Sequence, residues 1–115
     1  YTASGTVGTT LTIDVDFDWD THYIWWEFFT NADLATAHLA VPTAGEVTVT
    51  ASENGTNYGS VAVVTVSTAA YTRPYVGRPV TKIKCAPSVA ITGNSVTHWK
   101  VHVESGSMLD RKLSG

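Results

Sequence analysis

Residues 10–20 contain the feature that most constrains the fold of this chain, a strict alternation of apolar and polar side chains. The apolar positions are Leu11, Ile13, Val15, Phe17 and Trp19, and the polar positions are Thr12, Asp14, Asp16, Asp18 and Asp20. Successive side chains of a β-strand point to opposite faces, so this alternation predicts a strand through the whole segment, with one buried and one solvated face.

The composition extends this prediction to the rest of the chain. Of the 115 residues, 18 are Thr, 15 are Val and 4 are Ile. Branching at Cβ stiffens χ1 and favours the pleated sheet over the helix, and no segment shows the 3.6-residue apolar period of a helix. The length suits one domain. We therefore expect a single all-β domain.

Further strands follow at short spacing, separated by turn residues. They are predicted over residues 23–30, 46–51, 59–66, 80–85, 89–91 and 97–104, with breaks at Thr21-His22, Pro42, Asn54-Gly55, Pro87 and Gly93-Asn94. Residues 31–40 are expected to form a short helical turn or a loop. About seven strands in this pattern predict a β-sandwich with an Ig-like or jelly-roll layout.

The two ends of the chain are predicted to differ from its middle. Residues 1–10, rich in Gly and Thr, are expected to form an extended N-terminal arm, residues 11–104 the β-sandwich domain, and residues 105–115 a C-terminal tail. The unsatisfied backbone groups of an extended arm can pair with the edge of a sheet, so we expect the arm to reach a neighbouring molecule.

Charge is segregated along the chain. Residues 1–72 contain eight carboxylates and no Lys or Arg, a net charge of −8, whereas residues 73–115 contain seven bases and two acids, a net charge of +5. Two interpretations stay open. In the first, Lys82, Lys84 and Lys100 pair with the acidic strand within one sheet, or the acids are merely solvated. In the second, the acidic face of one subunit meets the basic loop of a neighbour.

Nucleic acid, membrane and metal partners are not expected. The overall net charge of −3 provides no electrostatic footprint for nucleic acid, and no run of apolar residues is long enough to span a membrane. The spacing Asp14-x-Asp16-x-Asp18 resembles the start of an EF-hand loop, but Trp19 and Trp25 occupy the positions that need Gly and Glu.

The remaining reactive side chains do not predict an enzyme or a cofactor. His98 and His102 would lie roughly 13 Å apart on a strand, too far to share a metal. No nucleophile frame, phosphate loop or dinucleotide fingerprint is present. Cys85 ends an apolar strand and is expected to be a small buried hydrophobe. The sequon Asn54-Gly55-Thr56 is interpreted as a hairpin tip.

The aromatic residues leave two interpretations. Four tryptophans are enough to build a small core, and two tyrosines flank Arg73 in an irregular loop that they would anchor; these residues are Trp19, Trp25, Trp26, Trp99, Tyr71 and Tyr75. Alternatively, exposed rings among them form a stacking platform for sugars or hot-spot contacts with a protein partner.

Three segments resemble small structural proteins of tailed-phage virions. They are Thr-Ala-Gly-Glu-Val-Thr-Val-Thr-Ala-Ser-Glu-Asn-Gly-Thr-Asn-Tyr-Gly at residues 43–59, Arg-Pro-Tyr-Val-Gly-Arg-Pro-Val-Thr-Lys-Ile-Lys at residues 73–84, and Val-Thr-His-Trp-Lys-Val-His-Val at residues 96–103. The shared features are a Thr/Val-rich strand, a Glu-Asn-Gly turn, an Arg-Pro loop and a closing strand opened by Thr-His. The similarity covers roughly residues 1–104.

This resemblance implies a binding role without catalysis. Proteins of this kind act as capsid decoration (cement) proteins, and the resemblance implies a homo-oligomer, a trimer, that binds the major capsid protein on the capsid exterior. We expect the contacts to involve the N-terminal arm, the Arg-Pro loop and the acidic strand, namely Arg73, Pro74, Tyr75, Arg78, Pro79, Asp14, Asp16 and Asp18. The alternatives are a tail, baseplate or fibre-associated component, and a carbohydrate-binding β-sandwich module.

Overall fold

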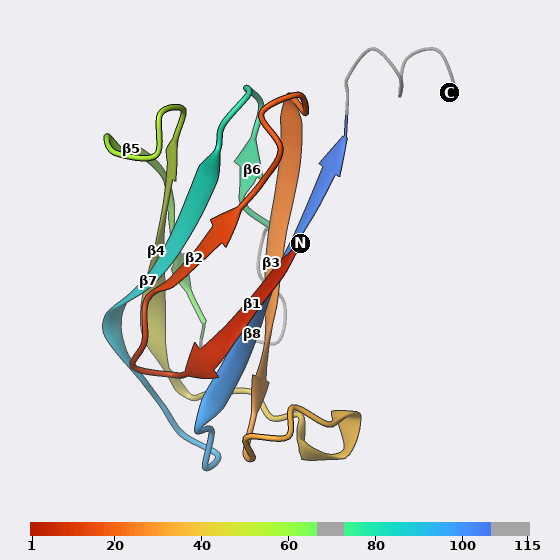
Figure 1. Ribbon diagram of the computed structural model, residues 1–115. Helices are drawn as coiled ribbons and strands as arrows, with labels where there is room; N and C mark the ends of the chain where they lie inside the picture. Colours follow the sequence, from red (N-terminus) through yellow and green to blue (C-terminus); the bar gives the residue numbers. More distant parts are fainter. Residues whose placement is uncertain (67–72, 107–115) are drawn as a thin grey trace.

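The chain folds into two four-stranded antiparallel sheets that face each other, as the computed structural model of residues 1–66 and 73–106 shows (Figure 1). Sheet A has the strand order β1-β8-β3-β6 and sheet B the order β2-β7-β4-β5. The strands are β1 (Thr2–Thr6), β2 (Leu11–Asp14), β3 (Thr21–Phe29), β4 (Ala44–Ser52), β5 (Gly59–Thr65), β6 (Tyr75–Val76), β7 (Lys82–Thr92) and β8 (His98–Gly106). The predicted β-sandwich is confirmed.

Helical structure is minimal. The 3-10 turn η1 (Thr36–His38) follows two turns in which a side chain accepts a backbone N–H: Asn31 Oδ1 accepts the Asp33 N–H at 3.2 Å and Asp33 Oδ1 accepts the Ala35 N–H at 3.0 Å. Residues 31–40 were expected to form a short helical turn or a loop, and they contain both: η1 covers residues 36–38, and Leu34 lies before it with a φ of +54°. Within the two described ranges, no helix is long and apolar enough to cross a bilayer.

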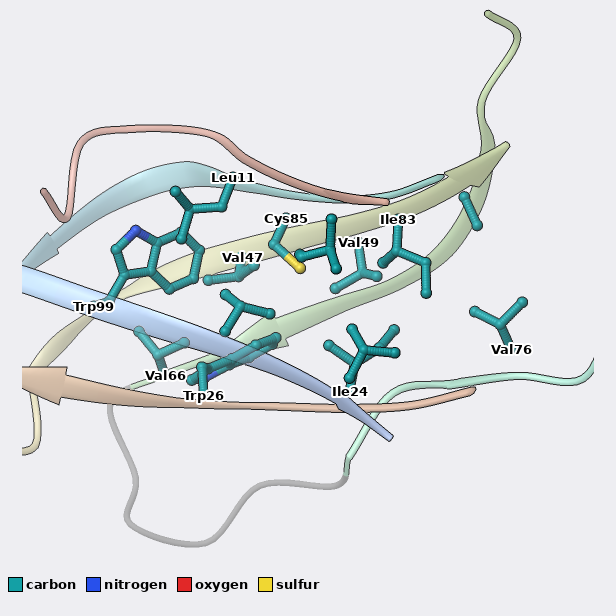
Figure 2. Close-up of a cluster of buried hydrophobic side chains, with 14 of the residues drawn as sticks. Leu11, Ile24, Trp26, Val47, Val49, Val66, Val76, Ile83, Cys85 and Trp99 are labelled. Carbon is teal, nitrogen blue, oxygen red and sulfur yellow. The ribbon is translucent and has the colours of Figure 1, made fainter. Parts of the chain in front are cut away.

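The core lies between the sheets and is built by period-2 alternation. In β8, Trp99, Val101 and Val103 are buried, whereas the intervening side chains point away from the core. The Trp99 ring stacks on Phe28 with ring centroids 5.9 Å apart and meets Trp26 edge-on at 6.3 Å. Figure 2 shows both tryptophans among aliphatic side chains of sheet B. The core role predicted for these two tryptophans is confirmed.

Cys85 points into the same core and is fully buried (Figure 2). Burial raises the pKa of its thiol to about 12, because the charged thiolate would lose its hydration. A thiol with such a pKa is not a nucleophile near neutral pH. Cys85 is therefore the small buried hydrophobe that the sequence predicts.

The N-terminal segment lies within the chain's own sheet. Thr2–Thr6 forms β1 and pairs antiparallel with β8, from Thr2 opposite His102 to Thr6 opposite His98. The Tyr1 and Val103 backbones exchange two further hydrogen bonds at 3.1 and 2.8 Å. The backbone groups of β1 that face β8 thus pair within the chain and not with a neighbour. At the other end, β8 extends to Gly106, and the rest of the predicted tail lies outside the described residues.

The strand predicted over residues 10–20 is too long. The ladder of β2 ends at Asp14, although burial continues to alternate through Val15. Beyond it, Asp16 Oδ1 accepts the Asp18 N–H at 2.9 Å and the Asp16 carbonyl accepts the Trp19 N–H at 3.2 Å. Aspartate side chains compete in this way for backbone donors and form turns. Phe17, expected on the buried face, is consequently 50% exposed.

Two predicted breaks are also wrong. Thr21 and His22 are not a turn: they begin β3 and are almost completely buried. Pro87 does not end a strand, because β7 continues through it to Thr92. Proline is tolerated there because the register shifts between Glu46 and Val47 of β4, which places Pro87 beside a bulge.

Gly93 is required where β7 turns toward β8. Its φ is +107°, and an added Cβ would lie 2.6 Å from the Thr43 backbone nitrogen. We expect Gly93→Ala to lower the free energy of unfolding by more than about 1 kcal/mol. Alanine is strained at this positive φ, and its Cβ would clash with the Thr43 backbone. Urea denaturation measures this effect. Gly8→Ala is the control, since a Cβ there meets no atom within 4 Å; equal losses in the two variants would contradict the expectation.

Candidate interaction surface

One end of the sandwich gathers three loops, which lie at the top of Figure 1. They are residues 15–20, 53–58 and 77–81. The Val15 N–H donates to the Thr81 carbonyl at 3.0 Å, and the Thr81 N–H donates to the Ser52 carbonyl at 2.8 Å. These backbone bonds tie the loops together, so this end, which we call the loop end, is a connected surface formed by segments far apart in sequence.

The β4–β5 loop is organised by one asparagine. Asn54 Oδ1 accepts the backbone N–H groups of Thr56 and Asn57 at 2.8 and 2.9 Å, and Gly55 has a φ of +80°. Asn-Gly favours such turns because glycine adopts positive φ without strain. The predicted hairpin tip at Asn54-Gly55 is confirmed.

The β2–β3 loop presents Phe17 to solvent between two carboxylates. The Asp16 turn described above holds the loop, and the Tyr1 hydroxyl oxygen accepts the Asp16 N–H at 3.3 Å. Asp16 and Asp18 are both exposed beside the half-exposed Phe17 ring. The β2–β3 loop therefore presents the aromatic ring of Phe17 flanked by the carboxylates of Asp16 and Asp18, and hydrogen bonds hold the loop in place.

Other charges of the loop end are neutralised within the chain. Lys82 Nζ donates to Asp14 Oδ1 at 2.5 Å, and this hydrogen bond raises the pKa of Lys82. Arg78 Nε lies 3.5 Å from Glu53 Oε1. The first interpretation of the charge segregation, pairing within one sheet, is thus correct for Lys82 and Asp14, which face each other on β7 and β2.

The other two lysines of that interpretation do not reach the acidic segment. Lys84 Nζ lies 3.9 Å from the centroid of the Tyr58 ring. Lys100 is opposite Glu27 in the register of β3 and β8. The Glu27 carboxylate, however, accepts a hydrogen bond from His102 Nε2 at 2.7 Å.

The predicted contact loop, residues 73–79, is divided between two surfaces. Arg78 and Pro79 lie at the loop end with Asp14, Asp16 and Asp18. Arg73 lies instead over the Trp25 ring, with 5.2 Å from its guanidinium carbon to the ring centroid. Tyr75 pairs with Tyr23 on β3, and the two ring centroids are 4.9 Å apart. Pro74 is buried, and its carbonyl accepts the Ile24 N–H at 3.0 Å.

Sequence reasoning missed the cluster on the outer face of sheet A. The Trp25 ring stacks on the His102 imidazole, with centroids 3.9 Å apart and planes 7° from parallel. The two residues are directly opposite in the register of β3 and β8. In sheet A, β3 lies between β8, which carries His102, and β6. Arg73 precedes β6 in the chain and so reaches Trp25 from the side of β3 opposite His102. The alternation Tyr23, Trp25, Glu27 was the available signal, but only the register could show what each side chain meets.

This packing argues against the sugar-stacking platform. Trp26 and Trp99 are core residues, and Trp25 is in contact with His102 and Arg73. The Tyr23 and Tyr75 rings are tilted by 40° and do not form a flat surface. Tyr71 lies outside the described residues.

His22 is a buried polar residue that the sequence did not single out. Its Nε2–H donates to the Trp19 carbonyl at 3.2 Å, and its Nδ1 accepts the Ser105 hydroxyl at 2.6 Å. Both ring nitrogens are therefore satisfied in a neutral imidazole. Burial lowers the pKa of His22 because the charged form would be desolvated, and the Trp19 carbonyl and the Asp20 carboxylate oppose this shift only in part.

No metal centre is formed by the side chains of residues 1–66 and 73–106, since no three His, Cys, Asp or Glu residues converge there. What this part of the chain offers a partner is protein surface: the loop end with Phe17, and the outer faces of two sheets. No protein-family model matches the sequence, and a search among curated proteins finds no match.

Proposed function

We propose that this chain is a non-enzymatic structural protein of a tailed-phage virion, a capsid decoration protein that binds the major capsid protein on the shell exterior. The observation that carries the proposal is Phe17, held half-exposed between Asp16 and Asp18 on the hydrogen-bonded β2–β3 loop. The similarity of residues 43–59, 73–84 and 96–103 to virion proteins gives the class of partner.

Phe17 has the properties of an interface anchor. An aromatic ring buried at the centre of an interface contributes more to affinity than the polar contacts around it. The flanking carboxylates select a basic rim on the partner and accelerate association with it. Because Asp14 and Glu53 already have cationic partners, Asp16 and Asp18 are the carboxylates best placed to meet that rim.

A rigid sandwich suits this role. A decoration protein needs a domain with one fixed conformation, because many copies must make the same contact with the shell. Modest individual affinities then stabilise the shell collectively when copies also bind one another. Three side chains of types often used in catalysis have structural contacts: Cys85 is in the core, His22 bridges Trp19 and Ser105, and His102 pairs with Glu27.

The proposal predicts that Phe17→Ser weakens binding to undecorated capsids. Loss of a central aromatic contact costs about 2 kcal/mol or more, roughly a 30-fold loss of affinity. Co-sedimentation of the purified chain with undecorated capsids measures this. Leu39→Ser is the matched control, because Leu39 is similarly exposed, at 44%, and forms a β-bridge with Phe29, the last residue of β3, whereas the β2–β3 loop that carries Phe17 precedes the first residue of β3.

The control variant should bind as the unmodified chain does. Capsids mixed with the unmodified chain should also survive heat or osmotic challenge better than bare capsids. Absence of binding by the unmodified chain, together with no gain in capsid survival, would refute the proposed function. Equal binding by Phe17→Ser and the unmodified chain would refute the role of Phe17.

A further inference from the structure

We infer that β5 is a self-association edge, at which two copies of this chain pair antiparallel about a two-fold axis and join their B sheets into one. The inference starts from the edges of the sandwich. The edge strands are β1 and β6 in sheet A, and β2 and β5 in sheet B. An edge strand presents unpaired N–H and C=O groups that can pair with another chain.

Three of these edges are short or closed by neighbouring structure. β6 has two residues and β2 has four. β1 has five, and its Gly5 faces Leu11 of β2 so closely that an added Cβ would lie 3.2 Å from the Leu11 side chain. β5 has seven residues, and β4 is the one strand that pairs with it in the described part of the chain.

β5 lacks the usual protection of an exposed edge. Natural edges carry charged side chains or proline, which discourage pairing with another molecule. The sequence of β5 is Gly-Ser-Val-Ala-Val-Val-Thr, without a charge or a proline. The register shift opposite Val49 and Thr50 is confined to the start of the strand, and residues 62–65 pair regularly with β4. These four residues therefore offer a regular, uncharged edge.

The core is incompletely covered along the same strand. Val61 and Val64 pack against the core but remain partly exposed, and Val63 is 63% exposed on the outer face. A strand added beside β5 would cover the margin of the core on one side and pack against Val63 on the other. Burial of this apolar surface is favourable, at about 25 cal/mol per Å².

A second copy of β5 fits this edge better than an unrelated strand. All sandwich strands pair antiparallel, and two identical strands related by a two-fold axis also pair antiparallel. No like charges meet, because the strand has none, and the facing side chains are Val, Thr and Ala. Cross-strand pairs of β-branched residues stabilise antiparallel sheets.

The ends of β5 favour the same orientation. At one end of β5, Arg78 lies beside Gly59, and the Arg78 side chain is exposed although it contacts Glu53. At the other end, Glu46 of β4 is opposite Thr65. Antiparallel pairing sets the Arg78 end of one copy against the Glu46 end of the other. A two-fold contact closes at two copies, so this edge forms a dimer and not the trimer that the resemblance implies.

Sedimentation equilibrium of the isolated 115-residue chain tests the inference, without capsids and independently of the proposed function. We expect a mass of twice the 12.3 kDa of one chain. Val63→Lys and Val63→Glu should each be monomeric, because like charges would meet across the new strand pair. An equimolar mixture of these two variants should recover the dimer mass, and Val63→Thr, the neutral β-branched control, should remain dimeric.

A single-chain or three-chain mass for the unmodified protein would overturn the inference, as would a dimer that survives Val63→Lys. Circular dichroism checks that the variants are folded. We expect them to fold because the Val63 side chain is exposed and a charge there is not buried in the core. Should the charged variants not fold, Val63→Cys gives a second measurement, since Cys85 is buried and does not compete. Oxidation should yield a covalent dimer with Val63→Cys and not with Leu39→Cys; the reverse would contradict the inference.

Discussion

Replacing Trp99 with alanine is expected to lower the free energy of unfolding by about 3–5 kcal/mol. Trp99 is fully buried, stacks on Phe28 and meets Trp26 edge-on. Its removal takes a large apolar surface out of the core and leaves a cavity between two sheets that cannot close without shifting β8. Because small domains are stable by only about 5–15 kcal/mol, the variant should unfold at much lower urea concentration or be unfolded at 37 °C.

Phe17→Ala is the matched control for this prediction. It also removes an aromatic ring, but from a side chain that is 50% exposed on a loop. Surface substitutions of this kind typically change stability by about 0.5 kcal/mol or less. Urea denaturation followed by circular dichroism compares the two variants with the unmodified chain. If Trp99→Ala were no more destabilising than Phe17→Ala, the assignment of Trp99 to the core would be wrong.

The free energy of unfolding is expected to decrease as the pH falls below 6.5, and His22 should contribute to this decrease. Burial lowers the pKa of His22 in the folded protein below its ordinary value of 6.5. Between 6.5 and the lower folded pKa, the unfolded chain binds a proton that the folded chain does not. Stability is therefore complete above pH 6.5, falls through this window and levels off below the folded pKa.

His22→Gln isolates this contribution, since glutamine keeps a polar side chain but does not titrate. The substitution should lower stability above pH 6.5, because it disturbs the bonds to Trp19 and Ser105. Its stability should then fall less steeply with acid than that of the unmodified chain. Parallel pH profiles would show that His22 does not bind its proton differently in the folded and unfolded states.

The strands whose alternation is undisturbed were predictable from sequence. The segment 97–104 alternates Trp99, Val101 and Val103 with polar residues, and it forms β8 with those three side chains buried. The segment 46–51 likewise lies within β4, and Asn54-Gly55 turns the chain. In each case, burial of one face and local turn chemistry favour the same structure.

Elsewhere a local interaction overrode the pattern. Asp16 continues the alternation of residues 10–20, but its carboxylate captures the Asp18 N–H and ends the extended segment. Thr21 and His22 are polar and follow a turn, yet hydrogen bonds from Thr21 Oγ1 to the Gly106 carbonyl and from His22 to Trp19 allow both to be buried. Such partners lie up to 85 residues away in sequence, so no window of the sequence reveals them.

The sequence indicated only in part which side chains lie together at the candidate site, and it placed Phe17 on the buried face. Asp14, Asp16, Asp18, Arg78 and Pro79 do share the loop end. Arg73 and Tyr75, only a few residues before Arg78, lie on the outer face of sheet A instead, because β6 pairs with β3 and separates them from the loop end. Strand order decides this division, and spacing along the chain does not determine strand order.

The N-terminal segment shows the same limit. Its Gly- and Thr-rich sequence correctly indicated an extended strand that adds to the edge of a sheet. The sheet is the chain's own, because β8 offers a free edge directly opposite residues 2–6. The longest edge among the described strands is β5, whose plain Val- and Thr-rich sequence resembles that of an ordinary interior strand.

The central claim is that this chain binds the outer surface of a phage capsid. Electron cryo-microscopy of virions that contain the chain tests this claim most directly. We expect density for two packed four-stranded sheets in many copies over the outer surface of the capsid, with the loop end and Phe17 against the major capsid protein. Few copies confined to the tail or baseplate, or no density on the particle, would contradict the claim.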